Sequence, residues 1–199
     1  MAGSALWGRA QEQSSMSSGG NMRRHPVVIL VLLALAAVTI IAHSQTQKAP
    51  LSPRKQAEAT IAGKKVIVDY GAPSMRGRKV MGEVVPYGQV WRTGANEATT
   101  LMTDADLMIG GTRVAAGKYT LFTLPAENGW KLIINKQTGQ WGTNYDEKQD
   151  LARVDMKVAK TQSPVEQMQI NFTPAQGGGA TMHLMWENTD ASVVVSPAK

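Results

Sequence analysis

The residues best suited to carry chemistry are crowded into one short stretch, residues 90–99, with the sequence VWRTGANEAT. An arginine guanidinium offers a planar fork of donors that matches a carboxylate, a sulfate or a phosphate. Indole and phenol rings offer flat faces that stack on sugar rings or on guanidinium groups. This combination predicts a site for a small anionic or sugar ligand, with these candidate residues in and just before the stretch: Tyr87, Trp91, Arg92, Asn96, Glu97 and Thr99.

A second polar cluster, DYGAPSMRGR at residues 69–78, precedes the first. Glycine and proline residues turn the chain in the middle of it. Between the two clusters, residues 78–85 (RKVMGEVV) fit one or two helical turns, and a chain that turns back there brings the clusters together. The second cluster adds four candidate ligand-binding residues: Asp69, Tyr70, Arg76 and Arg78.

The same side chains fit two other interpretations. In the first, Arg92 pairs with Glu97. Arg78 likewise pairs with Asp69, and the domain is a structural or interaction module without a pocket. Arg92→Ala is then strongly destabilising, whereas Arg76→Ala is nearly neutral. In the second, Asp69 and Glu97 act as one protonated and one ionised carboxylate of a glycosidase-like hydrolase. Because nearby arginines favour the ionised form of both, we expect a binding module rather than an enzyme and assign no catalytic residue.

Other common chemistries lack their residues. The chain has no cysteine, which excludes disulfides, thiolate nucleophiles and cysteine-bound zinc. It has no G-x-S-x-G motif, and the only histidine after residue 44 is His183, which we expect to be a packed or solvated strand residue. The glycines of QGGGAT lack the lysine of a phosphate-binding loop, and the acidic run at 146–150 lacks EF-hand spacing. We therefore expect no metal and no cofactor.

The charge balance argues against a nucleic-acid partner. The formal net charge is +6, but residues 1–49 hold four basic residues and one acidic residue and so account for +3 of it. The remaining +3 is spread over a surface of mixed sign, which is too little to predict binding to a polyanion.

Alternation of apolar and polar residues dominates the chain after residue 57. It is clearest in KVIVDY (65–70), WKLIINK (130–136) and EQMQINF (166–172), and it is typical of half-buried strands. Glycine-containing pairs between such segments suit the turns of hairpins. The sequence therefore predicts an all-β domain, an antiparallel β-sandwich of about nine strands with one short helical connection at 78–85.

The N-terminal quarter reads as an export segment and its flanks. Residues 22–44 combine a basic pair, Arg23 and Arg24, with an apolar run of about 16 residues and a small-x-small cleavage site. That run is shorter than the ~20 residues of a membrane span, so we expect a cleaved signal peptide, with an uncleaved inner-membrane anchor as the alternative. Either way the domain is exported, periplasmic or secreted, and meets the membrane only through this segment. We assign residues 1–21 to a disordered tail or upstream-start artefact, 45–55 to a linker and 56–199 to the domain.

Five segments appear in the order of one bacterial family: YGAPSMRGR, VPYGQVWRTGANEATT, AGKYTLFTLP, WGTNYDEKQD and MWENTDASVVV. From about Ser52 to Val195 the chain resembles the domain of unknown function 2911 (DUF2911). The resemblance implies an exported domain and assigns no activity. Carried over by motif, the family's characteristic residues fall on Tyr70, Pro73, Gly77, Arg78, Trp91, Arg92, Gly94, Asn96, Glu97 and Thr99.

The export assignment predicts where the mature chain begins. Cleavage after Ser44 removes the basic pair and the apolar run, so N-terminal sequencing of protein recovered from the native envelope is expected to start near Gln45. Intact protein in the cytosol contradicts export, and membrane-bound protein that retains its N-terminus supports the anchor instead.

Overall fold

The computed structural model describes residues 50–199. The predicted tail (1–21), the export segment (22–44) and residues 45–49 of the predicted linker lie outside the described residues. Within residues 50–199, no helix is long and apolar enough to cross a membrane.

The described chain is built from antiparallel strands, as the alternation predicts. The all-β class is confirmed, and the strand count matches the predicted number of about nine. The strands are β1 (Arg54–Ile61), β2 (Lys64–Gly71), β3 (Thr99–Thr103), β4 (Leu107–Ile109), β5 (Thr112–Val114), β6 (Gly117–Ala126), β7 (Gly129–Asn135), β8 (Asp150–Pro174) and β9 (Ala180–Pro197). Two single 3₁₀ turns accompany them, η1 (Glu147–Gln149) and η2 (Gln176–Gly178).

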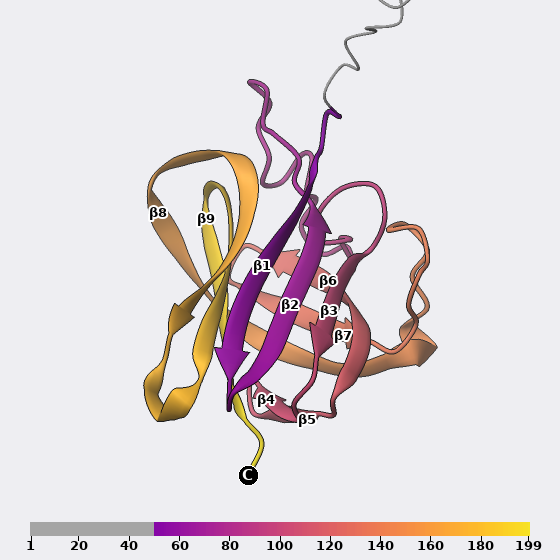
Figure 1. Cartoon of the computed structure of the whole chain (residues 1–199). Coiled ribbons are helices and arrows are strands. Elements are labelled where there is room, and N and C mark those ends of the chain that lie inside the picture. Colours follow the sequence, from indigo (N-terminus) through magenta and orange to yellow (C-terminus); the bar gives the residue numbers. More distant parts are fainter. Residues whose placement is uncertain (1–49) are drawn as a thin grey trace, which may run out of the picture. The chain divides into compact units, whose positions relative to one another are not determined.

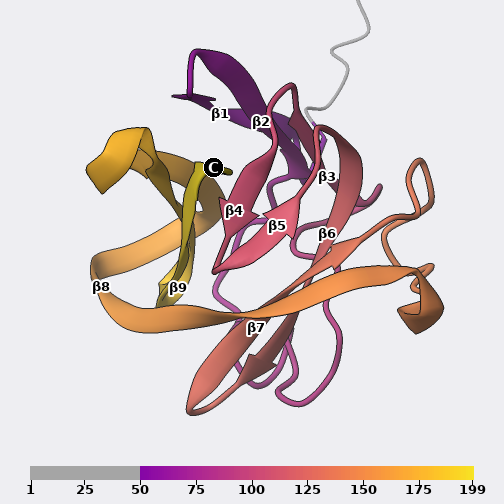
Figure 2. The same ribbon diagram turned by 90° about the horizontal axis from the view of Figure 1, so that it is seen from below.

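All nine strands belong to one sheet, in the order β1-β2-β3-β6-β7-β8-β9-β4-β5. The sheet folds over because β8 is 25 residues long and changes partner along its length. Residues 150–156 of β8 pair with β7, and residues 157–174 pair with β9. Figures 1 and 2 show β8 crossing from the β7 side of the molecule to the β9 side in a broad arc.

The β8–β9 hairpin bends where its register breaks. The breaks lie between Lys160 and Val165 and between Val165 and Gln169, so β8 carries more residues through the bend than β9 does. On the β9 side, Glu187 has a φ of 54°, which few residues other than glycine adopt. Within the second break, the chain that follows β2 closes onto β8: Met168 N donates to Pro73 O at 2.8 Å.

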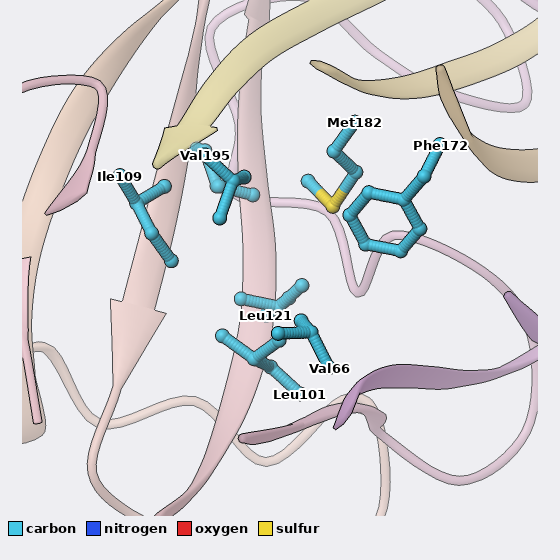
Figure 3. Close-up of a pocket in the computed structure, with 8 residues that line it drawn as sticks. Val66, Leu101, Ile109, Leu121, Phe172, Met182 and Val195 are labelled. Carbon is cyan, nitrogen blue, oxygen red and sulfur yellow. The ribbon is translucent and has the colours of Figure 1, made fainter. Parts of the chain in front are cut away.

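The core lies between the folded halves of this sheet. The alternating residues predicted to share a face in β2 and β7, such as Val66 and Leu132, are buried. Side chains from seven strands converge at its centre, among them Leu101, Met182 and Val195 (Figure 3). The gap between them is about 10 Å³, the space of about one water, so the interior of the sandwich is not a ligand site.

The helical connection predicted at residues 78–85 is wrong, because this segment forms tight turns. Gly82 has a φ of 88°, which interrupts a helix, and Val80 O accepts hydrogen bonds from Glu83 N and Val85 N at 3.3 and 2.9 Å. The apolar spacing that suggests a helix instead places Val80 and Val85 in the core with no exposed surface. The helical turns of the described chain lie elsewhere, at η1 and η2.

A carboxylate at the β9 bend anchors this segment. The Glu187 side chain accepts hydrogen bonds from Val80 N at 3.1 Å and from Met81 N at 3.2 Å. Neither amide donates to a backbone carbonyl of the described chain, so the carboxylate satisfies donors that burial would otherwise leave unpaired.

We expect Glu187→Ala to lower the free energy of unfolding by about 2–3 kcal/mol, because it removes the charged acceptor of two backbone amides. Glu187→Gln keeps one acceptor oxygen and is expected to cost less. As a control, Asp155→Ala breaks a surface pair in which Asp155 is 86% exposed, and it should change stability by less than about 1 kcal/mol. Urea unfolding at unchanged slope measures all three. Equal midpoints for Glu187→Ala and Asp155→Ala would show that the anchor is dispensable.

Candidate functional site

The stretch 90–99 forms an irregular bend that is held by buried threonines. Thr93 has a φ of 54°, an unusual conformation for a β-branched residue. Its hydroxyl lies 3.2 Å from the Thr123 hydroxyl, and its carbonyl accepts from the Thr99 hydroxyl at 2.8 Å. Asn96 also has a positive φ, 65°. Strained backbone of this kind persists only where its surroundings fix it, and it clusters at functional sites.

Two glycines allow the bend to lie directly on the end of β2. A Cβ on Gly71 would lie 2.1 Å from Ala95 O, and a Cβ on Gly94 would lie 2.8 Å from Gly71 O. Ala95 N donates to Gly71 O at 3.1 Å across this contact. Any side chain at either position separates the two backbones, so the close approach of the two clusters depends on glycine here.

Trp91 attaches the bend to two other tryptophans. Trp91 stacks on Trp186, with ring centroids 6.0 Å apart and an interplanar angle of 17°, and meets Trp130 edge-on at 6.4 Å. The Trp186 indole donates to Glu166 O at 3.2 Å. Trp91 therefore lies mainly in the core, with 9% of its surface exposed, and joins the bend to the β8–β9 fold.

A hollow of about 350 Å³ opens where the two clusters meet. It is lined by the turn after β2, by the bend and by the residues just before β1. Within the described chain, no carboxylate lines it. The candidate residues on its wall are Arg76, Arg78, Trp91, Arg92 and Asn96.

The three arginines of this hollow are anchored by backbone carbonyls. Arg76 donates from its guanidinium to Leu51 O at 2.6 Å, and Arg92 donates to Gly94 O at 3.3 Å. Arg78 donates to Met75 O and Ser74 O at 3.0 and 2.9 Å. Among residues 50–199, no carboxylate lies within salt-bridge distance of any of the three. The backbone amide of Arg76 does bind Glu166 Oε1, at 2.9 Å.

Carbonyl anchoring leaves the arginines with charge and donors to spare. A guanidinium has five N–H donors, and these contacts use one or two in each residue. A carbonyl oxygen orients the fork but does not neutralise it. The hollow therefore concentrates positive charge and planar donors that no other group of the described chain uses.

The predicted ion pairs are wrong, because a different arginine holds the carboxylates. Arg54 of β1 pairs with Asp69 and lies 3.8 Å from Glu97. Asp69 also accepts from the Gln56 amide at 2.9 Å. The register of β1 on β2 places Arg54 opposite Gly71, beside both acids. The sequence interpretation missed this contact because it assigned residue 54 to a linker.

The remaining candidates lie outside the hollow. Tyr70 is 3% exposed and crosses to β8, where its hydroxyl accepts from Ile170 N at 3.0 Å, and burial raises the pKa of the phenol. Thr99 is fully buried. Tyr87 is exposed and lines a different hollow beside Met81. These residues support the fold or face elsewhere rather than bordering the arginines.

A second, smaller hollow of about 170 Å³ adjoins the bend. The residues that line it on the far side of Arg92 were not predicted as candidates: Val90, Phe122, Gly142, Thr143 and Tyr145. Gly142, Thr143 and Tyr145 come from the segment WGTNYDEKQD, which carries part of the family resemblance. The family motif at residues 141–150 was the sequence feature that could have indicated these residues.

Tyr145 is fixed by charged neighbours. Its hydroxyl donates to Asp150 at 2.6 Å and accepts from Arg153 at 2.6 Å. Burial, together with the hydrogen bond to the Asp150 carboxylate, raises its pKa to about 12. The ring packs edge-on against Phe122 with centroids 4.9 Å apart. Tyr145 is therefore held in place and stays un-ionised at ordinary pH.

His183 lies in a polar chain on β8 and β9. Its Nε2 is 3.0 Å from the Thr173 hydroxyl, and its Nδ1 is 3.0 Å from Asp190. The order of groups is that of a hydroxyl, a base and an orienting acid. Thr173, however, is exposed on its strand, and none of the three residues lines either hollow beside the bend. The contact links two parts of β9 across its bend, so we assign it a structural role.

These observations define an all-β domain with a positively charged hollow built from two glycine-dependent turns. Residues 52–195 match the family described as "Protein of unknown function (DUF2911)", and the chain belongs to this family. No curated protein and no solved structure matches the chain.

The geometry reverses the expected stability effect of Arg92. Arg92→Ala is expected to cost only about 1 kcal/mol, because the residue makes one weak hydrogen bond and no ion pair among the described residues. Thr99→Val keeps the shape but removes the donor to the buried Thr93 carbonyl, and is expected to cost about 1–3 kcal/mol. Urea unfolding compares the two. A larger loss for Arg92→Ala than for Thr99→Val would restore the structural interpretation of this arginine.

Proposed function

We propose that this protein is an exported, non-catalytic module that binds a small anionic ligand in the hollow of about 350 Å³. The single observation that carries the proposal is the absence, among residues 50–199, of any carboxylate paired with the three arginines lining it. Three uncompensated guanidinium groups in one concavity repel one another, and an anion relieves that repulsion.

The other lining groups favour an anion that also carries hydroxyl groups. Asn96 supplies an amide that can donate and accept, and Ser52 and Ser74 lie on the same wall. Trp91 and Trp186 contribute apolar surface at the base. A sugar acid combines a carboxylate for the arginines with hydroxyls for these groups, and the volume lies within the range of small-molecule sites. Export places such a module where sugar acids of the cell envelope or its surroundings are accessible.

The glycosidase alternative has less support. A pair of catalytic carboxylates must face the scissile bond from two sides with open space between them. Asp69 and Glu97 are instead both in contact with Arg54, and neither lines the hollow with the arginines. We therefore do not propose hydrolysis.

Binding by the full chain to sodium D-galacturonate, sulfate and phosphate, with neutral D-galactose for comparison, tests the proposal. We expect galacturonate to bind and to raise the free energy of unfolding by about 2.7 kcal/mol at one hundred times its dissociation constant, and galactose to have little effect. Arg76→Ala and Arg78→Ala are each expected to weaken binding by about tenfold or more, because each removes a charge-assisted donor. Isothermal titration calorimetry measures the affinities.

Arg113→Ala is the matched control. Arg113 is an exposed arginine that pairs with Asp106 away from the hollow, so its removal changes net charge equally but leaves the site intact. An equal loss of affinity in this control would indicate general charge attraction only. Failure of all three anions to bind the unaltered chain would overturn the proposal.

A further inference from the structure

The two hollows beside the bend share a wall. Trp91 and Arg92 line both the larger hollow, with Arg76 and Arg78, and the smaller one, with Tyr145. The boundary between them is thus formed by two consecutive residues of one backbone segment. A ligand that passes over this boundary contacts both.

The Arg92 side chain is held at that boundary by the loop that ends at Tyr145. A Cβ on Gly142 would lie 2.7 Å from Arg92 Cδ, so the glycine backbone packs directly on the arginine stem. Gly142 N also donates to Asn96 O at 3.1 Å, and Ala98 N to Gln140 O at 3.4 Å. These contacts dock the loop on the bend and fix the arginine between the hollows.

The two hollows differ in chemistry. Arg92 is the only charged residue that lines the smaller hollow, among the residues described, whereas three arginines line the larger one. The smaller hollow offers the half-buried ring of Tyr145 and the exposed hydroxyl of Thr143, whereas Phe122 lines it but is only 1% exposed. Because the Tyr145 hydroxyl already bonds Asp150 and Arg153, it offers its ring rather than a new hydrogen bond. A sugar ring can lie against this surface, and Arg92, which also lines the smaller hollow, can bind the carboxylate that the ring carries.

We propose that the site binds an elongated acidic saccharide of two or more rings. One ring places its carboxylate against Arg76 and Arg78, and the next ring lies in the smaller hollow against Tyr145. Arg92 lies between them and bonds the linked groups from either side. This inference rests on the proposed function, because it extends the same site to a longer ligand.

The test compares D-galacturonate with its α-1,4-linked dimer and trimer by calorimetry on the full chain. We expect the oligomers to bind at least about tenfold more tightly than the monomer, since a second ring adds contacts without a second loss of overall motion. Thr143→Trp fills the smaller hollow and is expected to remove this advantage while leaving monomer affinity within about twofold. Asn144→Trp adds the same ring to the neighbouring residue, which lines neither hollow, and is expected to keep the advantage.

The outcomes separate the two proposals. If monomer and oligomers bind equally to the unaltered chain, the elongated ligand is overturned and the single-anion site stands. If Thr143→Trp and Asn144→Trp reduce oligomer binding equally, the smaller hollow is not a subsite. If neither monomer nor oligomer binds, this inference fails, and binding of sulfate or phosphate then shows whether the anion site itself remains.

Discussion

The contact between the backbone of Gly71 and that of Ala95 is the constraint on which the site depends. The two strands it joins are already fixed: Gly71 ends β2, and Thr99, four residues after Ala95, begins β3, which pairs with β2. The bend must therefore fit into the narrow space between them. Only glycine leaves room for that approach, and the arginines on either side are brought to one hollow as a result.

The distribution of charge around the bend follows from which partner each arginine finds. Arg54 lies in a regular strand, where the register sets it beside Asp69, and it is neutralised there. Arg76 and Arg92 lie in turns, and the backbone carbonyls of Leu51 and Gly94 orient them without cancelling their charge. One short region thus holds a structural ion pair beside arginines that have no carboxylate partner among residues 50–199.

The sequence predicted those features that depend on neighbours in the chain. Alternation in segments such as KVIVDY determines which side chains enter the core, and burial of Val66 and Val68 confirms it. The arginine that pairs with Asp69 could not be predicted in the same way, because Arg54 reaches Asp69 through a strand register that no local pattern specifies. The helix prediction for residues 78–85 is wrong for a related reason. The apolar spacing there suits a helix, but the carboxylate of Glu187, which is distant in sequence, holds the turn.

The chain enters the domain through the wall of its own hollow. Leu51 and Ser52 precede the first strand, yet they line the cavity, and the Leu51 carbonyl orients Arg76 at 2.6 Å. The next residue, Pro53, accepts a hydrogen bond from Ala72 N at 2.9 Å. The hollow therefore includes residues that lie outside the strands and their core. A recombinant domain trimmed to begin at Arg54 would retain all nine strands but lose one side of this hollow.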